Sequence, residues 1–214
     1  MRIKNNCSGL VASILVFGAL VSGQTTADEI SPLHLGMRVL EKKAVAGDSD
    51  LCALDMKLEL RFTNTSDSTV ILPRQAVGVT RIWVSGDERK FRDRVFEMNL
   101  TLSVFTADTE PEAITSIESF VELKPGESFT TDDSVVLFFP RTPGLVFEGA
   151  IRRGRHVLSI QIVLENFNDT GLEVLRKHFG SDAIIWSKPV VSDLLPFKIE
   201  EGLTCPAVAN GDGY

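Results

Sequence analysis

The sequence is poor in the residues and motifs that enzymes use for chemistry. Its 214 residues include three histidines and three cysteines. It has no G-x-S-x-G elbow, no H-E-x-x-H motif, no phosphate-binding loop, no dinucleotide fingerprint and no Cys-x-x-Cys pair. The carboxylates at residues 48–50 fail the spacing of a calcium loop, because Cys52 stands where the next ligand is required. We therefore expect a protein that is not an enzyme and that holds no metal or cofactor.

Basic residues and long apolar runs are also scarce. The chain has 22 Lys and Arg against 29 Asp and Glu, a formal charge of −7. Nucleic acids and anionic membranes select for basic surfaces, so neither is expected as a partner. The apolar run at residues 10–21 has 12 residues, well short of the roughly 20 that a membrane-spanning helix needs. With 43% hydrophobic and 24% charged residues, the composition is otherwise that of a globular protein.

The N-terminal segment follows the three-part layout of a secretory signal peptide. Arg2 and Lys4 precede the apolar run, and small residues follow it. We expect residues 1–23, or at most the first 27, to be removed, which leaves a single domain at residues 28–214. Without the two early basic residues, 20 basic and 29 acidic residues remain, a net charge of −9. A secreted or periplasmic location is predicted.

Two of the cysteines, Cys52 and Cys205, remain after the signal peptide is removed, because Cys7 lies inside it. An even pair in an oxidising compartment favours a disulfide. Two separate thiols are the alternative, because the Cα separation cannot be read from the sequence. In the chain-entropy model, a bridge closing nearly the whole domain contributes about 4 to 5 kcal/mol to stability.

Three segments alternate apolar and polar side chains, as strands with one wet face do. The clearest spans residues 54–64, with Leu54 and its alternate neighbours up to Phe62 on the apolar face. The others span residues 96–104 and 158–164. Shorter candidate strands lie at residues 35–40, 77–84, 119–123, 135–139 and 190–199.

Turn-forming residues separate these segments and help to predict the fold. Seven to nine short alternating strands favour an all-β, antiparallel, immunoglobulin-like β-sandwich, because buried parallel strands read as continuous apolar runs. One crossover helix is expected, capped by Asp169 or Thr170 and ended by Gly180. The charged segment 87–94 is interpreted as a solvated loop.

Four stretches carry a resemblance to known proteins. They are LELRFTNTSD at residues 58–67, LKPGES at 123–128, GRHVLSI at 154–160 and SKPV at 187–190. Together they resemble the immunoglobulin-like or fibronectin-like sandwich modules of bacterial exported proteins of unknown function. The order of an N-T-S turn, an L-x-P-G-E-S turn and a G-x-H-x-L strand is also similar to the intracellular proteinase inhibitor (BsuPI) family. That second resemblance implies protease inhibition, although the signal peptide and residues 84–120 depart from the inhibitor pattern.

Four arginines, Arg141, Arg152, Arg153 and Arg155, form the one basic cluster of the sequence. A turn that merely exposes charge explains such a cluster. Contact with an anionic ligand or a protein partner is the alternative, because guanidinium groups bind carboxylates. These four residues are the candidate partner contacts.

The tryptophans and histidines have two interpretations each. Trp83 and Trp186 are interpreted as core or inter-sheet residues, with stacking on a sugar or peptide as the alternative. His34, His156 and His178 are expected at surface or capping positions, with His156 on an outward-facing strand position and His178 near a helix end.

Together these observations predict an exported, non-enzymatic β-sandwich. Its role would be to bind a protein partner or to act as an accessory module in the cell envelope. A proteinase inhibitor and a carbohydrate-binding module are the alternatives. The sequence sets neither the oligomeric state nor the strand order.

Overall fold

The computed structural model describes residues 31–47, 50–74, 78–102, 117–163 and 169–206. Within them the chain is mostly β-strand, and the prediction of an all-β, antiparallel sandwich is confirmed. The predicted signal peptide lies outside the described residues, as do the ends of three predicted strands, at 77, 103–104 and 164.

The first sheet has three antiparallel strands. They are β1 (Leu33–Ala46), β2 (Leu51–Asn64) and β7 (Ser128–Pro140), in the order β1-β2-β7. The predicted alternation in β2 is confirmed, since Leu54, Leu58 and Phe62 are buried and Lys57 is exposed. β1 extends beyond the predicted residues 35–40, because β2 pairs with it from Leu33 to Ala46, through the charged stretch 41–43, which carries no apolar alternation.

The second sheet packs against the first. It has the order β10-β8-β4-β5, with β11 also paired to β8. Pro196 lies inside β11, where it is tolerated because β8 is the only described strand that pairs with this short edge strand. The strands are β4 (Val79–Ser85), β5 (Met98–Thr101), β8 (Gly154–Ile162), β10 (Val190–Val191) and β11 (Leu195–Ile199).

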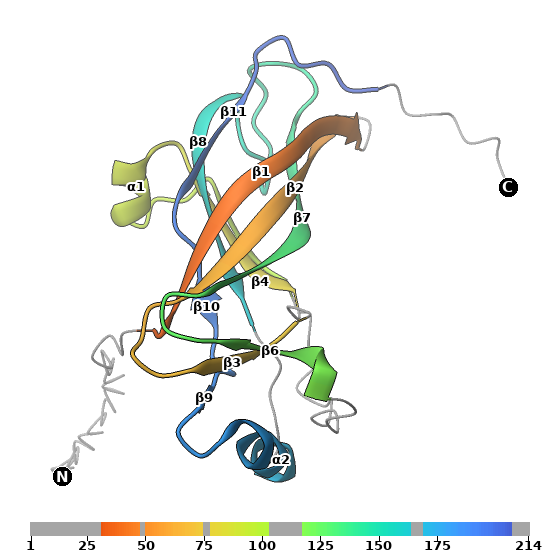
Figure 1. Cartoon of the computed structure of the whole chain (residues 1–214). Helices are drawn as coiled ribbons and strands as arrows, with labels where there is room; N and C mark the ends of the chain where they lie inside the picture. Colours follow the sequence, from red (N-terminus) through yellow and green to blue (C-terminus); the bar gives the residue numbers. More distant parts are fainter. Residues whose placement is uncertain (1–30, 48–49, 75–77, 103–116, 164–168, 207–214) are drawn as a thin grey trace, which may run out of the picture. The chain divides into compact units, whose positions relative to one another are not determined.

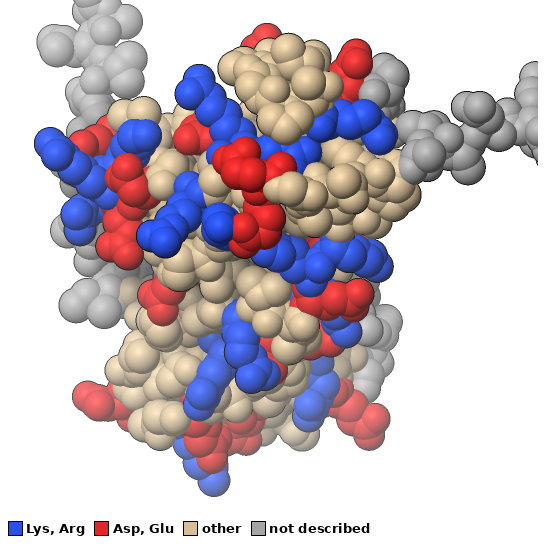
Figure 2. Space-filling model, turned by 90° about the horizontal axis from the view of Figure 1, so that it is seen from above, with Lys and Arg blue, Asp and Glu red and all other residues tan. Residues whose placement is uncertain are grey.

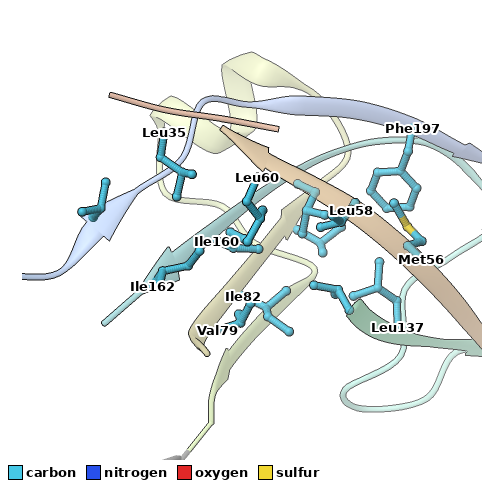
Figure 3. Packing of buried hydrophobic residues seen from close by; sticks show 14 of the residues in the cluster. Leu35, Met56, Leu58, Leu60, Val79, Ile82, Leu137, Ile160, Ile162 and Phe197 are labelled. Carbon is cyan, nitrogen blue, oxygen red and sulfur yellow. The ribbon is translucent and has the colours of Figure 1, made fainter. Parts of the chain in front are cut away.

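Apolar side chains from the two sheets meet between them to form the main core (Figure 3). The long strands contribute alternate residues, as the period of two requires, and a β-bulge between Val79 and Arg81 shifts the pattern in β4. From the first sheet come Leu35, Met56, Leu58, Leu60 and Leu137, and from the second come Val79, Ile82, Ile160, Ile162 and Phe197.

The strand β8 is buried on both faces for part of its length. Val157 and Ser159, expected on a wet face, are 5% and 1% exposed. Ser192 forms hydrogen bonds with this part of β8. Its carbonyl oxygen accepts a hydrogen bond from the Ser159 hydroxyl at 3.1 Å, and its hydroxyl oxygen accepts one from the Ile160 N–H at 3.0 Å. Ser159 can therefore be buried, because its hydroxyl group has a hydrogen-bond partner.

A third, small sheet lies near the Asn64 end of β2 (Figure 1). It has the order β6-β3-β9, from β6 (Phe120–Leu123), β3 (Val70–Pro73) and β9 (Ile184–Ile185), and β3 and β9 are parallel. The predicted helix is present as α2 (Asp169–Phe179), and Gly180, at φ 98°, ends it. Leu175 of α2 packs with Ile71 and Phe120 in a second apolar cluster.

Two features differ from the prediction. The charged segment expected as a loop contains a short helix, α1 (Glu88–Arg92), because the Asp87 carboxylate accepts the Lys90 N–H at 2.8 Å and caps it. The described residues form eleven strands instead of seven to nine, because two-residue strands such as β9 and β10 are too short to show alternation. A 3-10 turn (Ile117–Ser119) precedes β6.

Asn64 joins the two turns that carry the family resemblance. Its buried side-chain amide donates to the carbonyls of Ser68 and Leu123, each at 2.8 Å, and its Oδ1 accepts from the N–H and hydroxyl of Ser66. Its backbone exchanges hydrogen bonds with Gly126 and Glu127 of the L-x-P-G-E-S turn. The N-T-S and L-x-P-G-E-S turns thus form one hydrogen-bonded unit.

We expect Asn64→Asp to lower the free energy of unfolding by about 2 to 4 kcal/mol, because a carboxylate oxygen would face two carbonyl oxygens in a buried site. Urea unfolding followed by circular dichroism measures the change. Asp67→Ala, at an exposed position in the same turn, is the matched control and should change stability by less than about 0.5 kcal/mol. Equal effects of the two variants would contradict the role given to Asn64.

Candidate functional site

The loop between β7 and β8, residues 141–153, lies at the Cys52 end of β2, together with the segment that follows β11 (Figure 1). A pocket of about 400 Å³ opens there. Most of its wall comes from the loop and the adjoining end of β7. The lining residues are Pro140, Pro143, Gly144, Leu145, Val146, Arg152, Arg153 and Glu201.

We call residues 200–206, which follow β11, the C-terminal strap. The disulfide Cys52–Cys205 ties this strap to β2, with the two Cα atoms 5.9 Å apart and 153 positions apart in the sequence. The predicted bridge is therefore present. Leu203 and Cys205 of the strap also pack, partly buried, against the main core.

The Arg153 guanidinium also holds the strap, through hydrogen bonds to its backbone. Its Nη1 donates to the carbonyls of Glu200, Glu201 and Leu203 at 2.8 to 3.2 Å. Its Nη2 donates to the carbonyls of Pro140 and Arg141 at 3.4 and 3.2 Å. The face of the guanidinium lies 5.0 Å from the centre of the Phe139 ring. One side chain thus connects the end of β7, the start of β8 and the strap, as the planar fork of arginine allows.

The four arginines of the predicted basic cluster have different environments. Arg152 is exposed and Arg153 half-buried, and both line the pocket. Arg141 is half-buried and donates to the Pro206 carbonyl at 3.4 Å. Arg155 is exposed in β8, opposite Lys198 of β11, and does not line the pocket. The structure thus brings two of the four into one concave site.

The pocket wall carries two guanidinium groups, of Arg152 and Arg153, and one carboxylate, of Glu201. Within the described residues, no carboxylate lies within 4.0 Å of a guanidinium nitrogen of Arg152 or Arg153. Three cations on the first sheet, Arg38, Lys43 and Lys57, are paired by contrast, and the hydrogen bond between Lys57 and Asp132, 2.8 Å apart, raises the pKa of Lys57. Figure 2 views this end of the molecule, where basic and acidic side chains are interspersed and do not form a patch of a single charge.

Exposed apolar side chains lie on the pocket wall and on β7, the strand that leads to it. Val136 and Phe138 point outward from β7, between the buried Val135, Leu137 and Phe139, and are 43% and 39% exposed. Leu145 and Val146, on the pocket wall, are 47% and 68% exposed. We call Val136, Phe138, Leu145 and Val146 the apolar strip. The sequence did not predict the apolar strip. Its pattern indicated a strand at residues 135–139 and a turn at 143–144, but not which of their side chains would be exposed.

The expectation for His156 is wrong. Its side chain is 2% exposed, because His156 shares the inward face of β8 with Leu158 two residues on. Its Nε2 lies 2.8 Å from the Arg152 carbonyl oxygen and its Nδ1 3.6 Å from Glu97 Oε2, and the ring packs against Phe197. Neither ring nitrogen is placed against a serine or cysteine, as a nucleophile's base would be.

The other two histidines lie at the surface, as expected. His34 is half-exposed in β1 and lies 2.8 Å from Asp193. His178 is exposed in the last turn of α2 and packs edge-on against the Phe179 ring.

The two tryptophans differ in burial. Trp186 is 8% exposed and belongs to the main core, with Lys188 lying 5.7 Å from the centre of its ring. Trp83 is half-buried in β4, paired with Asn99 and Ser159 on the outward face of the second sheet. The interpretation of Trp186 as a core residue fits its position.

Other chemistry was sought in the described part of the chain. No group of three or more His, Cys, Asp or Glu side chains lies there in an arrangement that could hold a metal ion. None of the helices described combines the length and the apolarity needed to cross a membrane. Neither models of known protein families nor the sequences of characterised proteins match this chain.

Arg153→Lys should lower the free energy of unfolding by about 1 to 3 kcal/mol, because an ammonium group keeps the charge but cannot reach carbonyls on two sides. Arg155→Lys, two residues away and exposed, is the matched control and should leave stability unchanged. Urea unfolding of both variants, with the disulfide intact, measures the difference. An Arg153→Lys variant as stable as the control would show that the strap does not depend on this side chain.

Proposed function

We propose that this protein is an exported, non-enzymatic β-sandwich module of the cell envelope or its surroundings that binds a protein partner. The interface is the end of the molecule formed by the pocket and the apolar strip. The observation that carries the proposal is that the exposed side chains of Leu145 and Val146 line a pocket with two guanidinium groups that have no carboxylate partner among the described residues. Exposed apolar groups beside unpaired charge are characteristic of surfaces that another molecule covers.

The support for a binding function is the way the pocket is built. Arg153 and the disulfide hold the strap that supplies Glu201 to the pocket wall, and a wall fixed in advance lowers the cost of ordering when a partner docks. The Leu145 and Val146 side chains project from a loop supported by a rigid sheet, as recognition residues commonly do.

A secreted or periplasmic location is part of the proposal. The disulfide Cys52–Cys205 supports it, because such bridges persist in oxidising compartments. The environment of His156 supports the non-enzymatic part, since the most buried histidine of the described residues serves the backbone of Arg152 and a carboxylate.

Chemical cross-linking in the envelope fraction of the native host tests the proposed interface. The purified wild type should give a discrete cross-linked product with a host protein, and Val146→Asp should reduce that product at least about tenfold, because a carboxylate would be placed in an apolar contact.

Val191→Asp is the matched control for this experiment. Val191 is 53% exposed on β10, in the second sheet, and does not line the pocket. The control should cross-link like the wild type. A product that survives Val146→Asp but is lost in Val191→Asp would place the interface on the second sheet and overturn the assignment.

A further inference from the structure

We infer that the pocket recognises the C-terminal end of a partner polypeptide, with an apolar last side chain against the pocket wall and the terminal carboxylate on Arg152. The inference rests on the proposed function, because it names the part of the protein partner that enters the site. It follows from three properties of the pocket: its size, the apolar part of its wall, and the charge of the groups beside that wall.

The pocket is small for a protein interface. Its volume of about 400 Å³ lies near the lower end of the range for small-molecule sites, roughly 300 to 1,000 Å³. Such a volume holds one or two residues of an extended chain. It therefore suits the end of a polypeptide better than a continuous segment, which would have to enter and leave.

The walls place apolar and cationic groups within the same small volume. Pro140, Pro143, Leu145 and Val146 supply apolar surface, and Arg152 supplies an exposed guanidinium. A C-terminal residue carries its side chain and its carboxylate on one Cα atom, so both groups can be bound within this space. A guanidinium and a carboxylate form paired, charge-assisted hydrogen bonds.

The two arginines have separate tasks in this arrangement. The nitrogens Nη1 and Nη2 of Arg153 already donate to five carbonyls, so this residue contributes positive charge and rigidity. Arg152 makes no side-chain hydrogen bond or ion pair with the described residues and is free to bind the carboxylate. Because the chain as a whole carries a charge of −7, an acidic ligand is attracted by this local feature and not by the net charge.

Glu201 is the one acidic residue of the pocket wall. Its exposed carboxylate opposes an anionic ligand, since like charges at close range repel. Glu201 also allows a test of carboxylate recognition. Replacing it with neutral glutamine should strengthen the binding of a carboxylate ligand and leave the binding of an uncharged ligand unchanged. A surface that merely attracts apolar groups would not respond in this way.

The test is fluorescence anisotropy with the full-length mature protein, its disulfide intact, and a labelled hexapeptide, Gly-Ser-Gly-Ser-Val-Leu. The peptide is used as the free C-terminal acid and as the C-terminal amide. The acid should bind at least about tenfold more tightly than the amide, because the amide has lost the charged partner of Arg152. A third peptide, with an internal glutamate beside Val-Leu and an amidated end, should bind no better than the amide.

Three variants separate the contributions. Arg152→Gln should weaken binding of the acid about three- to tenfold and leave the amide unchanged. Arg155→Gln removes the same charge outside the pocket and should have no effect on either peptide. Glu201→Gln should strengthen binding of the acid about two- to fivefold and leave the amide unchanged. Circular dichroism and a thiol count show that each variant is folded and bridged.

Equal affinity for acid and amide would overturn the recognition of a carboxylate. Equal affinity for the acid and the internal-glutamate peptide would overturn the choice of a chain end. If none of the peptides binds at up to about 1 mM while Val146→Asp still abolishes the cross-linked product, this inference fails and the proposed interface stands. Binding that persists equally in Arg152→Gln and Arg155→Gln would also contradict it.

Discussion

The guanidinium group of Arg153 ties together three segments that are far apart in the sequence. It donates to carbonyls at the end of β7 and to carbonyls of the C-terminal strap, and it belongs to the turn that opens β8. The disulfide Cys52–Cys205 fixes the same strap to β2. Because the strap supplies Glu201 to the pocket and Arg153 supplies part of its wall, these two constraints fix part of the pocket lining.

The opposite end of β2 is held by a different kind of polar contact. There the buried amide of Asn64 bonds four groups of its own turn and of β6, and its backbone pairs with the L-x-P-G-E-S turn. One end of β2 is thus tied to its neighbours by the hydrogen bonds of Asn64 and the other by the disulfide Cys52–Cys205, while the apolar core fills the middle.

Much of the fold could be predicted from the alternation of apolar and polar residues, which has a period of two in a β-strand. Residues 54–64 alternate so regularly that the buried face of β2 was predicted residue by residue, and the pair Cys52–Cys205 followed from the count of cysteines. The same alternation in β8 places His156 on the inward face with Leu158, two residues on. The prediction of an outward-facing His156 did not apply that rule.

The arginine cluster could be found from the sequence, but the contacts of Arg153 could not, because they depend on where the C-terminal strap, distant in sequence, lies. The apolar strip could not be predicted either, because exposure at Val136 and Leu145 depends on what the neighbouring strands leave uncovered.

Site-specific photo-crosslinking in the native host tests most directly whether the pocket end is the interface. A photo-reactive benzoylphenylalanine takes the place of Leu145 on the pocket wall, or of Val191 on the second sheet as the comparison. The account predicts one discrete adduct with a host protein from position 145 and none from position 191. An adduct from position 191 alone, with position 145 silent, would contradict the account.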